Sequence, residues 1–149
     1  MKVSKLFSLI LLSLLFLYNV TFANDELDPR IKAQYSTVEK NLLEGLKSDN
    51  EGLRVSCEYY LGEMKSKKAV IPLMHILRDD PSYPARIVAA LSLIKIEDPQ
   101  GVYMVGRSID FNTNEGVRKM SKKFYLSHLL KKYLEQHPEK APDFAFLGL

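Results

Sequence analysis

The chain has 149 residues, of which 46% are hydrophobic and 26% charged, and its formal net charge is +3. This length predicts a single domain, and the near balance of 21 basic and 18 acidic residues excludes an overall basic field of the kind that binds nucleic acid. Cys57 is the only cysteine, so internal disulfides are excluded and packing must stabilise the fold. Its thiol is either a reactive group or a small core residue, and its place in the apolar stripe of a helix favours the core.

Residues 1–23 have the pattern of a secretory signal peptide. Two lysines are followed by an apolar run from 6 to 17, and the segment ends on Ala23. An uncleaved membrane anchor is the alternative, but the 17 residues of 6–22 are near the lower limit for a bilayer span and Asn19 interrupts them. We expect cleavage after Ala23 and a soluble exported protein, periplasmic or secreted, that is not inserted in a membrane.

Without that leader the chain keeps 126 residues (149 minus 23), enough to bury about two thirds of its unfolded surface. Its net charge falls by two lysines from +3 to +1, which argues further against a nucleic-acid partner. Residues 24–30 are expected to form a linker to a helical domain over 31–136.

The first predicted pair of helices lies within residues 31–64. Ser36 to Glu39 reads as a capping box that opens a helix carrying Leu42, Leu43 and Leu46. The next two pairs are expected over 66–96 and 98–136. Their first helices begin after the N-cap residues Ser66 and Asp98, with Pro99 at the first helical position, and carry apolar stripes. The stripe residues are Val70, Leu73 and Leu77, then Val102, Val105 and Ile109.

The second helix of each pair recurs with a period of 32 residues, marked by Arg54, Arg86 and Arg118. Four residues before each arginine stands an N-cap type: Asn50, Ser82 and Asn114. Positions −1, +3, +7 and +10 from each arginine have helical spacing and form a predicted core stripe. Its members are Leu53, Cys57, Leu61 and Met64, then Ala85, Ala89, Leu93 and Ile96, then Val117, Ser121, Tyr125 and His128.

This pattern predicts an all-α fold. Its period, with two short helices in each unit, indicates a short α-solenoid, a right-handed superhelix of about three helix-turn-helix repeats. In such a fold each hairpin buries its apolar face against its neighbours.

Residues 61–96 resemble a HEAT-like repeat of the short variety noted in phycobilisome lyases. The matching residues are Leu61, Gly62, Ala69, Val70, Pro72, Leu73, Leu77, Asp80, Arg86, Ala89, Ala90 and Leu93. The third unit keeps Val117 and Arg118 but lacks the Pro-Leu pair and the alanines. The resemblance implies the fold and a habit of binding proteins, but not lyase activity. It also implies that the repeat arginine braces neighbouring units and pairs with the acidic residue of the turn.

Catalytic and metal chemistry are poorly supported. The three histidines show no helical pair with a nearby carboxylate, so we expect neither a metal nor a cofactor. Asp79 and Asp80 precede Pro81, where aspartate suits a turn, although an enzymatic site with Arg86 is the alternative.

A binding surface is predicted on the second helices, at positions +1, +4 and +5 from each arginine. These are Val55, Glu58 and Tyr59, then Ile87, Ala90 and Leu91, then Lys119, Lys122 and Lys123. An apolar patch with a basic end is typical of a protein-binding surface, unless the middle helix is simply buried all round. We expect a non-enzymatic module that binds an acidic protein or peptide, with a structural spacer or a homodimer as the alternative. The expected partner-binding residues are Val55, Tyr59, Ile87, Leu91, Lys119, Lys122 and Lys123.

The C-terminal tail, 137–149, contains apolar residues that are unfavourable in water. Phe144, Phe146, Leu147 and Leu149 are expected either to cover the open end of the solenoid or to dock into a partner. The preceding basic stretch could bind a membrane surface, but its apolar residues are better explained as the core of the last repeat.

Overall fold

The computed structural model describes residues 29–140. The chain divides into two compact units, Met1–Tyr35 and Ser36–Leu149. The predicted signal peptide (1–23), most of the predicted linker and residues 141–149 of the tail lie outside the described residues.

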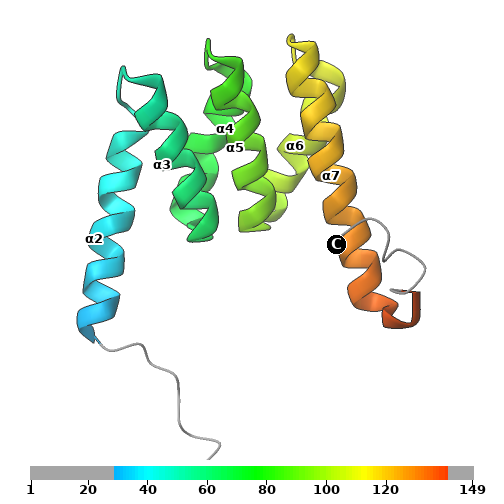
Figure 1. The fold of residues 1–149 in the computed structure, drawn as a ribbon, viewed down its shortest axis with the longest axis horizontal. Coiled ribbons are helices and arrows are strands. Elements are labelled where there is room, and N and C mark those ends of the chain that lie inside the picture. The colour runs from blue at the N-terminus through cyan, green and yellow to red at the C-terminus, as the bar shows by residue number, and fades with distance from the viewer. Residues whose placement is uncertain (1–28, 141–149) are drawn as a thin grey trace, which may run out of the picture. The chain divides into compact units, whose positions relative to one another are not determined.

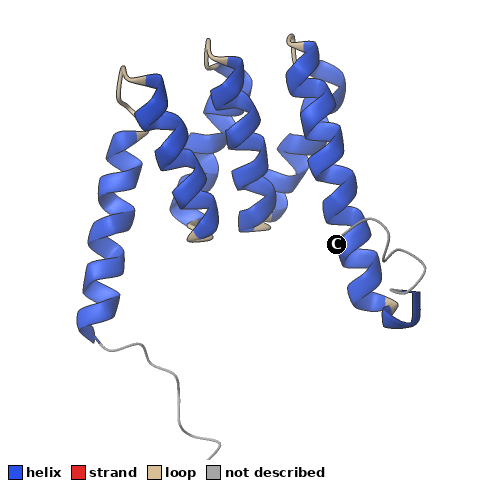
Figure 2. Cartoon of the chain, viewed as in Figure 1, coloured by secondary structure: helices blue, strands red, loops and turns tan. Residues whose placement is uncertain are grey.

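The described residues form α-helices joined by short turns, with no strand between 29 and 140, which confirms the all-α class (Figure 2). The helices are α2 (Pro29–Gly45), α3 (Glu51–Glu63), α4 (Val70–Asp79), α5 (Tyr83–Ile96), α6 (Pro99–Phe111) and α7 (Glu115–Gln136), with a short 3₁₀ helix η1 (Lys67–Ala69) before α4. None of these helices is both long and apolar enough to cross a bilayer.

Within the second unit the helices form two layers. Helices α3, α5 and α7 lie side by side in chain order, and α4 and α6 pack beside each other behind them (Figure 1). Because α4 also packs on α5 and α6 on α7, each helix of the rear layer is bound to the helix that follows it. The core lies between the layers and contains fully buried leucines at 61, 73, 77 and 93.

The three predicted N-caps of the front layer are confirmed. Asn50 Oδ1 accepts from Leu53 N over 3.1 Å, and Ser82 and Asn114 accept from the residue three positions on over 3.2 and 3.1 Å. Asp98 also caps α6, with Pro99 as its first residue. These ends are well defined because each cap satisfies a backbone N–H that the helix itself cannot bond.

One expectation about helix starts was wrong, and a second, that Ser66 is an N-cap, is confirmed in position but not in its side-chain bond. Helix α2 begins at Pro29, so the Ser36–Glu39 stretch is helix interior and not a capping box, and the linker ends sooner than expected. Proline is favoured in a first helical turn, and no helix-breaking residue follows until Gly45. Ser66 precedes η1 but makes no cap bond; its hydroxyl donates instead to Glu39 Oε1 over 2.6 Å.

The turns that precede α3, α5 and α7 share one hydrogen-bond pattern. In each, the arginine donates to the carbonyl oxygen of the residue six positions earlier. The pairs are Arg54 to Ser48 at 2.9 Å, Arg86 to Asp80, and Arg118 to Asn112 at 2.8 Å. The side chain of the accepting residue in turn accepts from a backbone N–H two positions on. A guanidinium fork suits these fixed contacts.

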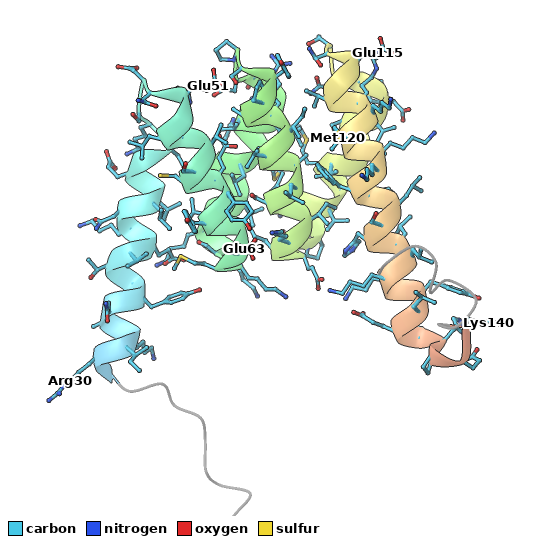
Figure 3. All side chains as sticks on the ribbon, in the orientation of Figure 1. Arg30, Glu51, Glu63, Glu115, Met120 and Lys140 are labelled. Atoms are coloured by element: carbon cyan, nitrogen blue, oxygen red, sulfur yellow. The ribbon has the colours of Figure 1, made fainter. Side chains whose placement is uncertain are left out.

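Two of these arginines also reach the next turn. Arg54 Nη2 lies 3.4 Å from Asp80 Oδ1, and Arg86 Nη1 lies 3.4 Å from Asn112 Oδ1 and 3.2 Å from Thr113 Oγ1. Glu51 and Glu115, labelled in Figure 3, mark the first residues of α3 and α7 at the same edge of the layer as these turns. The edge is therefore held by a chain of turn-to-turn hydrogen bonds.

Most of the predicted core stripe is buried, including Cys57, but Leu53 is 48% exposed and was wrongly placed in the core. Leu53 lies in the first described helix of the front layer, so no earlier helix among residues 29–140 covers it from within that layer, whereas its counterparts Ala85 and Val117 are fully covered. Burial at this position thus depends on the neighbouring helix.

Candidate functional site

A groove of about 620 Å³ lies on the front layer between α5 and α7. Its apolar side chains are Leu91, Ile94, Phe124 and Leu134, and its polar ones are Lys95, Glu97, Ser127, His128, Lys131 and Glu135. The size is in the range of ligand pockets and of clefts that take a few apolar side chains.

The groove results from the unequal lengths of its two helices. Helix α5 has 14 residues and ends at Ile96, where Glu97 turns the chain with a left-handed φ of 59°. Helix α7 has 22 residues and continues past that point (Figure 1). The apolar face of its C-terminal half therefore has no neighbouring helix of full length, and Leu134 remains only half-buried.

Ion pairs join the two walls at the rim. Lys131 Nζ lies 2.9 Å from Glu97 Oε1, and Lys132 Nζ lies 3.4 Å from Glu97 Oε2. The hydrogen bond from Lys131 is the largest cause that lowers the pKa of Glu97 to about 2, with Lys132 adding to it. Lys95 pairs in the same way with Glu63, labelled at the end of α3 in Figure 3. These lysines are therefore neutralised by acids of the same chain.

His128 lines the groove with an unsatisfied polar atom. His128 is 9% exposed. Its Nδ1 is buried and has no hydrogen-bond partner in the described part of the chain. Buried polar atoms are rarely left without a partner. The position was predicted as the last member of the core stripe, and the orphaned nitrogen could not be read from that pattern.

Three lysines of α7 differ from those of the rim. Lys119, Lys122 and Lys123 are exposed, and no ion pair within residues 29–140 involves any of them. They lie on the N-terminal half of the helix that forms one wall of the groove. The groove-lining side chains of α7 recur at 124, 127, 128, 131 and 134, whereas Lys122 lies on the opposite side of the helix, so α7 carries the groove on its α5 side and uncompensated positive charge on its outer side.

The other predicted partner-binding residues are only partly brought together. Leu91 lines the groove, and Ile87, one turn earlier on α5, is half-buried. Val55 is half-buried on α3, and Tyr59 is 41% exposed, with Lys95 Nζ 4.6 Å from its ring centre. The predicted partner-binding residues are therefore spread over α3, α5 and α7, whereas the groove lies between α5 and α7 only.

Two residues at the +4 position of the predicted surface, Glu58 and Ala90, are buried, and for Ala90 burial was the favoured alternative. Glu58 and Ala90 are both 0% exposed, whereas Lys122, at the same repeat position on α7, is open to solvent. The +4 position faces the next helix of the front layer, and no described helix follows α7 in that layer. Burial of the middle helix at this position, weighed as the alternative, is therefore observed.

The groups of the alternative enzymatic site are engaged in the turn. Asp80 Oδ1 accepts from Ser82 N over 2.8 Å and lies 3.4 Å from Arg54 Nη2, while Arg86 binds the turn before α7. Asp79 is exposed and pairs with Arg78 at 2.7 Å. Within the described residues, no cluster of three or more histidine, cysteine or acidic side chains has a geometry suited to a metal ion.

Most residues of the groove were not predicted from the sequence. Ile94 and Leu134 were not singled out, and Phe124 was expected in the core of the last unit. The available signal was the apolar pattern of 117–136 continuing eight residues beyond the length of the equivalent helix α5, 22 against 14.

A comparison with protein-family models gives no match for this chain, and a comparison with curated proteins gives none either.

Proposed function

We propose that this chain is a non-enzymatic protein-binding module that acts after export, in the periplasm or outside the cell. Its partner is an acidic protein segment with bulky apolar side chains, held on the front layer. The observation that carries the proposal is that one helix, α7, bears an apolar groove on its α5 side and, in its N-terminal half, three exposed lysines that form no ion pair within residues 29–140. Export is supported by the leader-like pattern of residues 1–23.

The architecture proposed for this module is a right-handed α-solenoid of three HEAT-like repeats. The 32-residue recurrence of the arginine, of its N-cap and of the turn acceptor six residues earlier supports it. So does the packing of α3, α5 and α7 in chain order, since repeats of a solenoid contact mainly their neighbours.

The groove and the lysines have different roles in binding: the groove supplies most of the binding energy, and the lysines mainly speed association. Each bulky apolar side chain that fills the groove contributes about 1.5–3 kcal/mol of burial, against which ordering and loss of rotational freedom must be set. The exposed lysines add modest energy, about 0.2–1 kcal/mol each, and mainly speed association with an acidic segment.

The test is a charge reversal of the lysine patch. The probe is a set of fluorescein-labelled short peptides that alternate Phe or Leu with Asp or Glu, and binding is measured by anisotropy at several salt concentrations. Lys119→Glu, Lys122→Glu and Lys123→Glu together should weaken binding about tenfold or more and remove most of its salt dependence.

A matched control reverses three other exposed lysines: Lys32, Lys40 and Lys67. It changes the net charge equally but leaves the α7 patch intact, so the affinity should stay within about twofold of the unmodified chain. Equal weakening by both triples would show a non-specific charge effect. No binding of any probe, or binding unchanged by the α7 triple, would refute the proposed function.

A further inference from the structure

We infer that the segment 141–149 of the same chain occupies the groove between α5 and α7 when no partner is bound. The inference rests on the proposed function, because it takes the groove as a site for apolar protein segments, and it adds that the first ligand of this site is internal.

The segment follows directly from the helix that forms one wall. Helix α7 ends at Gln136, and Lys140 N donates to His137 O over 3.0 Å in the turn that follows. From Gln136 back to Phe124 the helix measures about 18 Å at 1.5 Å per residue. Nine extended residues span about 30 Å, so 141–149 can run back along α7 past the whole groove.

The composition of the segment matches that of the groove. Its four bulky apolar residues, Phe144, Phe146, Leu147 and Leu149, stand against an apolar lining of similar size from both helices. Because successive side chains of an extended segment point to opposite sides, Phe144 and Phe146 share one side. Leaving these rings in water is unfavourable by about 1.5–3 kcal/mol each.

A residue that lines the groove also carries an unsatisfied polar atom. His128 Nδ1 is buried in the groove wall and unpartnered within residues 29–140. An extended segment carries a free N–H and C=O at each residue, and one of them would satisfy this nitrogen once the imidazole ring turns toward the groove. An apolar lining alone would not favour a polypeptide segment over any other apolar ligand as the occupant of the groove.

If segment 141–149 occupies the groove, it competes with the partner for the same site. A tethered segment acts at an effective concentration of about millimolar, so the apparent affinity for a partner falls by the fraction of molecules whose groove is filled. The variant Phe144→Ser with Phe146→Ser should therefore bind the acidic–apolar probe several-fold more tightly than the unmodified chain.

A direct test uses the absence of tryptophan from this sequence. In the full chain with Phe146→Trp, the single indole should emit at short wavelength and resist quenching by acrylamide. Adding Ser127→Arg, which places a bulky charge at an exposed position in the groove, should move the emission to long wavelength. The matched control Ser56→Arg alters an exposed serine of α3 that does not line the groove, and should leave the emission unchanged.

Long-wavelength emission from Phe146→Trp alone, or emission insensitive to Ser127→Arg, would overturn the inference. Emission that shifts on dilution would also overturn it, in favour of a second copy as the occupant. If the indole is exposed while the probe binds and responds to the lysine triple, only the inference fails. If the indole is in the groove and no probe binds, only the proposed function fails.

Discussion

Glu58 is the most unusual residue of the front layer. Its side chain is fully buried in α3, and neither carboxylate oxygen has a hydrogen-bond partner within the described residues. Burial is the main cause that raises its pKa from 4.5 to about 8, and the charge of Asp80 adds to the shift while Arg54 opposes it. At neutral pH most molecules therefore carry this carboxyl in its uncharged form.

The raised pKa predicts how stability depends on pH. The folded chain holds a proton on Glu58 that the unfolded chain loses at lower pH, so the free energy of unfolding should fall as pH rises from about 4.5 to about 8. The decrease from this group is at most about 1.4 kcal/mol per pH unit. Glu58→Gln, which keeps shape and stays neutral, should remove that slope in urea unfolding at a series of pH values.

The control for this prediction is Glu44→Gln, because Glu44 is exposed and its ion pair within residues 29–140 is with Lys47, in the turn just after α2. It should leave the pH slope as it is. An unchanged slope in Glu58→Gln would mean that Glu58 is ionised in the folded protein.

Between elements, α3 approaches the backbone of α5 closely at Gly62. A Cβ added to Gly62 would lie 2.8 Å from Ser92 Cα and 2.7 Å from its Cβ, and Ser92 Oγ donates to Glu58 O over 2.8 Å across the same contact. The backbone of α5 cannot move away without disturbing that bond. A glycine here thus sets the spacing of the front layer.

Gly62→Ala should therefore lower the free energy of unfolding by about 1–3 kcal/mol, despite the better helix propensity of alanine. Chemical denaturation measures the change. Gly52→Ala is the control: its Cβ would lie 3.3 Å from Asn50 Oδ1, the end of one exposed side chain and not backbone, so any loss of stability should be smaller than that of Gly62→Ala. A stabilising Gly62→Ala would contradict the close packing of α3 and α5.

Arg86 and Arg118 connect their turns to neighbouring elements to different extents, so the two can be compared by the same substitution. Arg86 binds its own turn and also Asn112 and Thr113 of the next one, whereas the side-chain hydrogen bonds of Arg118 to described residues lie within its own turn. Arg86→Lys should lower the free energy of unfolding by about 1–2 kcal/mol, and Arg118→Lys by less, since lysine cannot form the forked contact. Equal losses in the two variants would argue that the turn-to-turn bonds contribute nothing.

Across the whole molecule, local chemistry was predictable and neighbour-dependent features were not. The N-caps Asn50, Ser82 and Asn114 were found because a cap acts within one turn of its own helix. Burial of Glu58 could not be found, since its periodicity matches that of Lys122 and only the neighbouring helix differs. The 32-residue spacing identified the three repeat arginines. It did not identify the residues six positions earlier that accept their hydrogen bonds, because those residues are of ordinary turn types.

The groove belongs to this second class of features. It depends on the difference in length between α5 and α7 and on their separation, neither of which periodicity specifies. The exposure of Lys119, Lys122 and Lys123 was predicted correctly. The sequence did not show that they differ from Lys95 and Lys131, which pair with Glu63 and Glu97.

The most direct measurement of the central claim, that the α5–α7 face binds protein, is hydrogen–deuterium exchange of the full chain with and without a saturating acidic–apolar peptide probe. We expect slower exchange in residues 91–97 and 117–134 on binding, and unchanged exchange in α4 and α6. Slower exchange confined to α4 and α6, or no change anywhere while the probe is bound, would contradict it.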